Sequence, residues 1–254
     1  MERFIKKTAK EAGKIILDLF GKIDVHYTKN TLHDVVTKAD LVSQKIIVDA
    51  IKKEHPSHGI VGEEENLAHQ SDADYVWYID PLDGTKNFST RAPLFGINIG
   101  LAHNGDVILG AVYLPPTDEF CFAEKGKGAF LNGKKIKCSE KKEWAYSYGL
   151  GGMSASPKNA HVRKVVGALS DNTAWVMAIA SSAVAAVYVA DGRRDWYISR
   201  GSALWDYAGP SIILKEAGCI VTNAQGQNWS LNDKEMFASN QYLHPTLIEM
   251  IQKK

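Results

Sequence analysis

The chain has 254 residues, of which 45% are hydrophobic and 23% are charged, and its formal net charge is +1 at pH 7. This length and composition are typical of a globular protein with one large domain or two closely packed halves. Because the net charge is close to zero, there is no broad electrostatic basis for binding a nucleic-acid polymer or an acidic membrane surface.

Two absences in the sequence bear on location. The three cysteines, Cys121, Cys138 and Cys219, have neither zinc-site spacing nor the pattern of a disulfide framework. No apolar run is long enough to span a bilayer, and the first residues lack the apolar core of a signal peptide. We therefore expect a cytoplasmic protein with no membrane partner.

The first 140 residues are expected to form two helices and an antiparallel meander of strands. Apolar residues recur at helical spacing over residues 1–20, and again from Asp40 until just before Pro56. Thr37 or Asp40 can cap the second helix. Strands are expected at 96–103, 107–114 and 119–124, followed by a hairpin at 126–136, because apolar runs alternate there with turn residues.

A second half begins near residue 141 and mixes helices with strands. Strands are expected at 145–149, 174–179, 195–198, 219–222 and 236–239, and helices at 158–169, 182–190, 204–217 and 243–251. No repeat or low-complexity linker interrupts the chain. The sequence therefore predicts an α/β protein with halves at 1–140 and 141–254.

The most informative stretch is Trp77 to Phe88. Its apolar start predicts a buried strand, which we expect to end at Asp80-Pro81 because proline cannot donate to a strand ladder. Asp80 and Asp83 then lie in a tight turn with Gly84 and Thr85. Two nearby carboxylates repel each other unless a cation lies between them, and Mg²⁺ prefers carboxylate, water and phosphate oxygens. The stretch therefore suggests a metal-phosphate site, although an ordinary surface turn also favours proline, aspartate and glycine.

Two remote acids are candidates for the same site. A short apolar strand ends at Glu63, which is a candidate ligand or base within what can otherwise be a solvated acidic patch. Asp206 lies in the first turn of a predicted helix, where the helix dipole favours a carboxylate. Its alternative role is to join Asp80 and Asp83 around a metal.

Three separated motifs resemble those of the inositol monophosphatase family of Mg²⁺-dependent, lithium-sensitive phosphatases. They are Gly62-Glu63-Glu64, Asp80-Pro81-Leu82-Asp83-Gly84-Thr85 and Trp205-Asp206-Tyr207-Ala208. The resemblance covers essentially the whole chain. It implies a layered α/β sandwich with two helices and an antiparallel sheet in residues 1–140. Residues 141–254 would then hold a mixed sheet flanked by helices, with the active site between the halves.

The resemblance also implies roles for single residues around two or three Mg²⁺ ions. Glu63, Asp80 and the carbonyl of Leu82 would hold one ion, and Asp80, Asp83 and Asp206 a second. Glu63 and Thr85 would orient and deprotonate the attacking water, with Asp83 as a further catalytic residue. The amides of Gly84 and Thr85 would bind phosphate. The expected mobile-loop residues, which help form a weaker metal site, are Lys29, Asp34, Thr37 and Asp40.

The substrate is less well defined by the sequence. Substrate contacts are expected at Ser182, Ser199 and Arg200, but inositol-selective relatives carry a glutamate where Ser199 stands. Inositol 1-phosphate is the first candidate, and fructose 1,6-bisphosphate, 3′-phosphoadenosine 5′-phosphate and histidinol phosphate stay open. The family is often dimeric, so a homodimer is expected.

Two alternative functions also stay open: a phosphatase of a different mechanism and a protein that is not an enzyme. The aspartates resemble the haloacid-dehalogenase signature, in which an aspartate attacks phosphorus, although Asp80 and Asp83 are separated by two residues instead of one. A non-catalytic, metal-dependent regulatory module would require a damaged catalytic set. Glu63 and Thr85 are both present.

Overall fold

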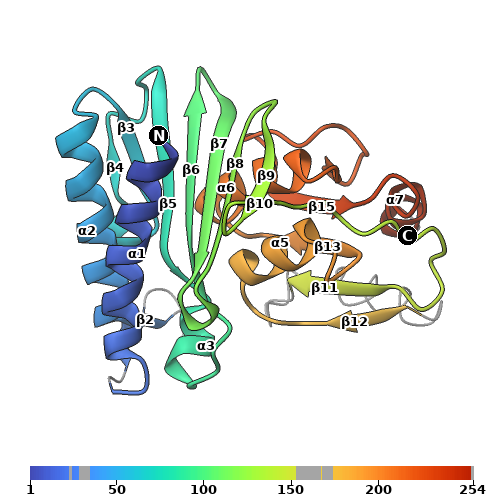
Figure 1. Ribbon diagram of the computed structural model, residues 1–254, viewed down its shortest axis with the longest axis horizontal. Helices are drawn as coiled ribbons and strands as arrows, with labels where there is room; N and C mark the ends of the chain where they lie inside the picture. Colours follow the sequence, from blue (N-terminus) through green and yellow to red (C-terminus); the bar gives the residue numbers. More distant parts are fainter. Residues whose placement is uncertain (23–24, 29–34, 153–166, 168–173, 253–254) are drawn as a thin grey trace.

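The computed structural model describes residues 1–22, 25–28, 35–152, 167 and 174–252. These residues form five layers in the order helix, sheet, helix, sheet, helix, as Figure 1 shows from left to right. This is the layered α/β sandwich that the family resemblance implied. Lys29, Asp34 and nearly all of the helix expected at 158–169 lie outside the described residues.

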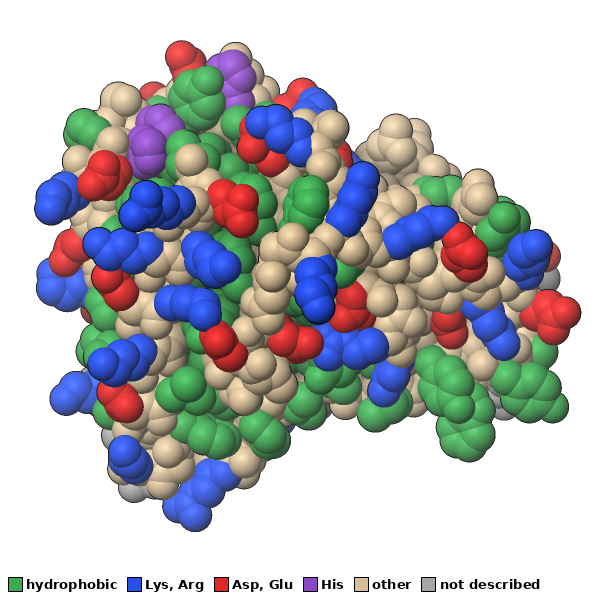
Figure 2. Space-filling model, in the orientation of Figure 1, with side chains coloured by type: hydrophobic (Ala, Val, Ile, Leu, Met, Phe, Trp, Pro, Cys, Tyr) green, Lys and Arg blue, Asp and Glu red, His purple; other side chains and the backbone are tan. Residues whose placement is uncertain are grey.

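The outer layer consists of α1 (Glu2–Leu19) and α2 (Lys38–Glu54), which agree with the predicted helices to within about two residues. The inner face of α1 buries Ile5, Ala12 and Ile16 against the large sheet. Basic and acidic side chains are interspersed over the exposed face of this layer (Figure 2), and Lys7 pairs with Glu11 at 3.8 Å. The lysines therefore form the solvated face of an amphipathic helix.

The large sheet has eight strands in the order β10-β9-β8-β7-β6-β5-β3-β4. All neighbours are antiparallel except β3 and β5, which run parallel. The strands β6, β7 and β8 form the predicted meander. The bounds are β3 Gly59–Gly62, β4 Ala68–His69, β5 Tyr75–Asp83, β6 Gly96–His103, β7 Asp106–Leu114, β8 Glu119–Glu124, β9 Gly128–Leu131 and β10 Lys134–Lys135; a separate hairpin pairs β1 Val25–Thr28 with β2 Val35–Thr37.

The expectation that the central strand ends at Asp80-Pro81 is wrong, because β5 continues to Asp83. Its ladder with β6 pairs Asp80 with Asn98, becomes irregular, and resumes where Asp83 pairs with Gly96. Pro81 lies in this bulge, where its missing N–H breaks no regular ladder bond. Both aspartates are therefore held on a buried strand end and not in a surface turn.

The second sheet has five strands in the order β12-β11-β13-β15-β14. Their bounds are β11 Tyr148–Gly152, β12 Trp175–Met177, β13 Trp196–Arg200, β14 Ile220–Thr222 and β15 Glu235–Ser239. Parallel and antiparallel pairs both occur, as the family resemblance implied. The strand expected at 145–149 lies at 148–152 instead. The glycines at 149, 151 and 152 disfavour a strand by themselves, but the pairing of β11 with β12 and β13 on either side holds them in the sheet.

Two helices lie between the sheets and one covers the far side. The inner pair is α5 (Ser182–Ala190) and α6 (Leu204–Glu216), and α7 (His244–Gln252) packs on the second sheet. The helix α6 approaches β7 closely at Gly110, where an added Cβ would lie 2.3 Å from the carbonyl oxygen of Gly209. None of the described helices is long and apolar enough to cross a membrane.

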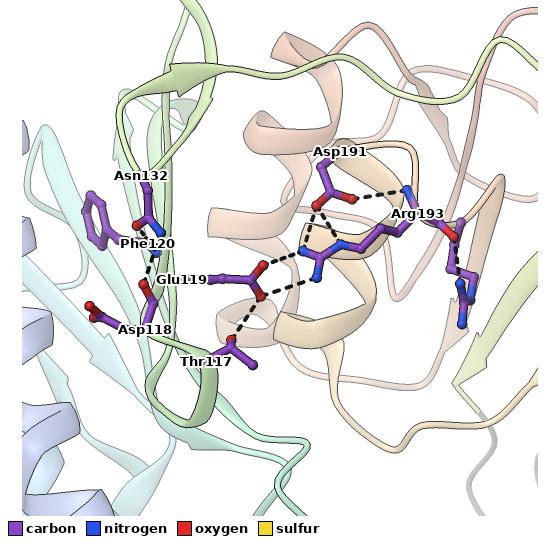
Figure 3. Close-up of polar contacts among 8 residues, drawn as sticks. Thr117, Asp118, Glu119, Phe120, Asn132, Asp191 and Arg193 are labelled. Atoms are coloured by element: carbon purple, nitrogen blue, oxygen red, sulfur yellow. Dashed lines mark hydrogen bonds and ion pairs between the residues drawn. The ribbon is translucent and has the colours of Figure 1, made fainter.

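Polar contacts also join the two halves of the chain. Arg193, just after α5, contacts Glu119 of β8 at 2.9 Å and Asp191 at 2.6 Å (Figure 3). The packing of α6 on the large sheet places the first turn of α6 at the carboxyl end of β5.

Candidate active site

Three carboxylates meet where β5 ends against α6, two of them buried and that of Asp206 half-buried. Asp80 and Asp83 come from the end of β5, and Asp206 comes from the first turn of α6. Each offers an oxygen, and these oxygens all lie within 4.8 Å of one another. The structure thus brings together the three aspartates that the sequence placed in one site.

Glu63 joins this cluster through the parallel pairing of β3 with β5. Gly62 pairs with Ile79, and the backbone N–H of Glu63 donates to the carbonyl of Ile79 at 3.2 Å. The side chain of Glu63 forms a hydrogen bond with Asp80. All four acids that the motifs singled out therefore lie at one point of the fold.

The pKa values of Asp80, Asp83 and Asp206 are all raised, so these three aspartates hold protons more tightly than they would in water. Burial is the largest cause of the raised pKa of Asp80, and Glu63, Asp83 and Asp206 raise it further. Burial, Asp83 and Glu63 raise the pKa of Asp206 to about 8. Such a site is stabilised by positive charge, because like charges in a poorly hydrated pocket repel one another.

The helix α5 holds Asp83 in place. The Oδ1 atom of Asp83 accepts from the backbone N–H of Ser182 at 3.0 Å and from the Ser182 hydroxyl at 2.9 Å. Its Oδ2 accepts from the backbone N–H of Ala183 at 2.9 Å and from the Ser181 hydroxyl. Ser182 lies at the site as expected, but its hydroxyl is committed to Asp83.

Sequence reasoning missed Ser181 and Asn98, which donates to Ser182. Ser181 also caps α5 by accepting from the N–H of Val184, and a serine before an alanine-rich helix was the available signal. Asn98 is the one polar residue within the buried part of β6, and a polar side chain in such an apolar run was the signal there.

Thr85 and Asp40 form a second part of the site. The Thr85 hydroxyl lies 2.9 Å from both Asp40 Oδ1 and the carbonyl of Leu82, and it can donate to one of them at a time. Asp40 Oδ2 accepts from the N–H and the hydroxyl of Thr37, which completes a capping box on α2. Burial is the main cause that raises the pKa of Asp40 to about 6.

Thr37 and Asp40 were expected in a mobile loop, but the structure places them elsewhere. Thr37 ends β2 and caps α2, and Asp40 lies fully buried in the first turn of that helix. Gly84 has φ +85° and leads into the short helix α3 (Thr85–Ser89), and an added Cβ there would lie 2.8 Å from the carbonyl oxygen of Leu94. This close approach and positive φ favour glycine.

A hollow of about 200 Å³ opens beside the acids. Its walls include Asp83, Asp206 and the three expected substrate residues, Ser182, Ser199 and Arg200. The Ser199 hydroxyl lies 3.2 Å from the hydroxyls of Tyr207 and Ser202. Arg200 donates to Glu235 at 3.0 Å and leaves about 44% of its side chain exposed.

Comparison with known proteins identifies the family. The model of the inositol monophosphatase family matches residues 1–254. This chain belongs to the inositol monophosphatase family.

Individual relatives agree with that assignment. The fructose-1,6-bisphosphatase/inositol-1-monophosphatase of Thermotoga maritima is 32% identical over 248 residues, which cover 98% of this chain and 94% of the relative. Inositol monophosphatase 1 of Homo sapiens is 30% identical and covers 91% of this chain and 86% of its own length. The crystal structure of the suppressor protein suhB from Bartonella henselae superposes with a TM-score of 0.94 and 27% identity, covering 99% of this chain and 98% of that one.

The family has a definite chemistry. Its members are Mg²⁺-dependent phosphoric monoester hydrolases, and the chain is an enzyme of this class. The acid cluster at the end of β5 is the part of the fold that suits this chemistry.

Proposed function

We propose that this enzyme hydrolyses monophosphates of small polyols or sugars by attack of water on phosphorus, with inositol 1-phosphate as the first candidate substrate. The observation that carries the proposal is the position of the acid cluster at the edge of a small, hydroxyl-lined hollow. The acids suit a metal ion and phosphate, and the hollow suits a compact polar alcohol.

The donor set fits Mg²⁺. Carboxylate oxygens are the ligands that this hard cation prefers, and no cysteine or histidine belongs to the cluster among the described residues. Asp80, Asp83 and Asp206 would hold one ion, and Glu63, Asp80 and the Leu82 carbonyl another. Bound Mg²⁺ would lower the pKa of water and offset the charge of the phosphoryl oxygens.

The protein groups around the metal site prepare the water and the phosphate. When the Thr85 hydroxyl donates to Asp40, its oxygen is left to accept from the attacking water, while Glu63 can take up the proton. The amides of Gly84 and Thr85 follow directly on Asp83 and would bind phosphate oxygens. Asp83 would keep its carboxylate aimed at the site because α5 fixes both of its oxygens.

A bisphosphate is the second candidate substrate, and Arg200 favours it. The guanidinium lies on the wall of the hollow, and its pair with Glu235 leaves further N–H donors for an anion. Fructose 1,6-bisphosphate and 3′-phosphoadenosine 5′-phosphate both present a second phosphate. Histidinol phosphate is a third possibility within the family.

A phosphate-release screen tests the proposal. Purified enzyme with Mg²⁺ is offered inositol 1-phosphate, fructose 1,6-bisphosphate, 3′-phosphoadenosine 5′-phosphate and histidinol phosphate at equal concentrations. We expect the highest kcat/KM for inositol 1-phosphate. A preference of more than about tenfold for a bisphosphate would transfer the proposal to the second candidate, and release from none of them would refute it.

Some expectations stay predictions. They are the number of Mg²⁺ ions, strong inhibition by Li⁺, the homodimer, the cytoplasmic location and the part that Lys29 and Asp34 play in a weaker metal site. Water attack, which inverts configuration at phosphorus, is favoured over a phospho-aspartate at Asp80 because the family match covers the whole chain.

A further inference from the structure

Hydrogen bonds hold both carboxylate oxygens of Asp83. Its two oxygens accept four hydrogen bonds, two from backbone amides of α5 and two from serine hydroxyls. The backbone amides are fixed by the helix. The Ser182 hydroxyl is different, because it can rotate unless another group holds its oxygen.

Asn98, in the other half of the protein, restrains the Ser182 hydroxyl. Its Nδ2 donates to the Ser182 oxygen at 3.0 Å, and Ser182 then donates to Asp83 Oδ1 at 2.9 Å. These two hydrogen bonds form a relay from Asn98 on β6, through Ser182 in the first turn of α5, to Asp83 at the end of β5. Asn98 pairs with Asp80 in the sheet, so it lies directly beside the acid cluster.

The amide of Asn98 is only partly satisfied. Asn98 is fully buried, and its Oδ1 has no hydrogen-bond partner among the described residues. A buried polar atom without a partner destabilises the fold relative to an apolar side chain of the same shape. An amide at this position is therefore a poor choice for packing and calls for a functional reason.

We propose that Asn98 is a positioning residue that acts through Ser182 to orient Asp83 for Mg²⁺. The inference rests on the proposed function, since it takes Asp83 to be a metal ligand. Groups that hydrogen-bond to metal ligands fix the orientation of those ligands, and their loss commonly weakens metal binding by about 10- to 100-fold.

Metal binding and folding stability together test the relay. Mg²⁺ is titrated calorimetrically into the chelator-treated full chain, and the Tm of each metal-free protein is measured in parallel. Ser182→Ala removes only the hydroxyl, and Asn98→Leu replaces the amide by an apolar group of similar shape. Ser182→Thr keeps the hydroxyl. Ser211→Ala removes a buried hydroxyl of α6 whose one hydrogen bond within the described part of the chain is to the carbonyl of Ala208.

We expect Ser182→Ala and Asn98→Leu to weaken Mg²⁺ binding by about tenfold, with Ser182→Thr close to wild type and Ser211→Ala unchanged. The metal-free Tm of Asn98→Leu should equal or exceed that of the wild type, because the unpaired buried oxygen is removed. A purely structural role would instead lower Tm while leaving the Mg²⁺ dissociation constant unchanged, and that result would overturn the relay.

Asp206→Asn separates this inference from the proposed metal site. If Asp206→Asn loses Mg²⁺ binding while Ser182→Ala and Asn98→Leu bind as tightly as wild type, only the relay is refuted. If Asp206→Asn also binds as wild type does, the metal site itself is wrong.

Discussion

Asp206 brings one more acidic group into a site that is already crowded with carboxyl groups. Its Oδ2 accepts from the backbone N–H of Ala203 at 2.7 Å, and its pKa is raised by burial and by Asp83 and Glu63. At the residue scale, the acids therefore oppose the stability of the metal-free protein and become favourable only with a cation. Ser181 and Ser182 limit this loss of stability by donating hydrogen bonds to Asp83.

Asp206→Asn should separate activity from stability. The amide oxygen can still accept from Ala203, but one charge of the cluster is lost. We expect kcat to fall by at least about 100-fold, since a metal ligand supplies several kcal/mol of transition-state stabilisation. The metal-free Tm at pH 7 should be unchanged or higher, because an acid whose pKa is raised on folding destabilises the folded protein above its unfolded pKa, and asparagine removes that effect. Steady-state kinetics and thermal unfolding in chelator check this, and near-normal turnover would contradict the assigned site.

Arg200→Gln should change substrate preference. Hydrogen bonds to charged groups contribute about 1.5–3 kcal/mol, so a second phosphate at Arg200 would be worth at least about tenfold in kcat/KM. We expect that loss for fructose 1,6-bisphosphate and less than about a twofold change for inositol 1-phosphate. Arg3→Gln, on the exposed side of α1, is the control. Equal effects on both substrates would remove Arg200 from phosphate recognition.

At the element scale, α6 links chemistry to packing. Its first turn carries Asp206, and further along its length it lies against β6 and β7 with almost no space for side chains at Gly110. A shift of α6 would therefore move Asp206 away from the end of β5. The packing of this helix is part of the geometry of the site.

Gly110→Ala tests that link. The new methyl group would meet the Gly209 carbonyl, which is backbone and cannot rotate away. Overpacking of this kind costs about 1–3 kcal/mol of unfolding free energy. We expect that loss in urea unfolding, together with weaker Mg²⁺ binding as Asp206 is displaced. Wild-type stability in this variant would show that α6 is free to move.

The second sheet contains a histidine that makes stability depend on pH. His244, at the start of α7, contacts Thr222 of β14 at 2.9 Å and Ser239 of β15 at 3.0 Å. Burial lowers the pKa of His244 to about 4. As the pH falls below about 6.5, this histidine takes up a proton in the unfolded chain but stays neutral in the folded protein. The free energy of unfolding is therefore highest above about pH 6.5 and falls as the pH is lowered towards 4.

This linkage gives a measurable pH dependence. We expect His244 to contribute a loss of about 2 kcal/mol of unfolding free energy between pH 7 and pH 5. His244→Gln should flatten the profile over that range, although its stability at pH 7 should be lower. Urea unfolding at several pH values measures the effect, with His69→Gln as a control at a residue without such burial. An unchanged slope in His244→Gln would assign the pH dependence to other groups.

At the scale of the whole molecule, the two halves share one interior. The buried cluster around α5 and α6 includes Val112 and Cys121 of the large sheet as well as Ile213 and Val221 of the second half. Arg193 adds an ion pair with Glu119 across the same boundary. We propose that residues 1–140 and 141–254 are structural halves that fold as one cooperative unit.

Coincident unfolding transitions would support that proposal. Five of the six tryptophans lie in residues 141–254, so fluorescence mainly reports the second half, whereas far-ultraviolet circular dichroism reports the whole chain. We expect both probes to give the same urea midpoint. Two separated transitions would instead identify two independent domains.

The sequence by itself determined the elements whose signals are local. The apolar spacing in α1 and α2, the turn residues between β6, β7 and β8, and the acids at the ends of β3 and β5 all follow from neighbours along the chain. Because side-chain periodicity and turn chemistry act over a few residues, such features can be read before any tertiary contact is known. The motifs around Glu63, Asp80 and Asp206 predicted a metal site through their resemblance to those of the inositol monophosphatase family.

Only the tertiary structure decided how these pieces meet. The bulge that carries β5 past Pro81, the parallel pairing that sets Glu63 beside Asp80, and the four donors on Asp83 join segments remote in sequence. The relay from Asn98 to Ser182 spans 84 positions of the chain. Such contacts depend on the packing of both sheets around α5 and α6, and no local pattern of residues encodes which side chains that packing brings together.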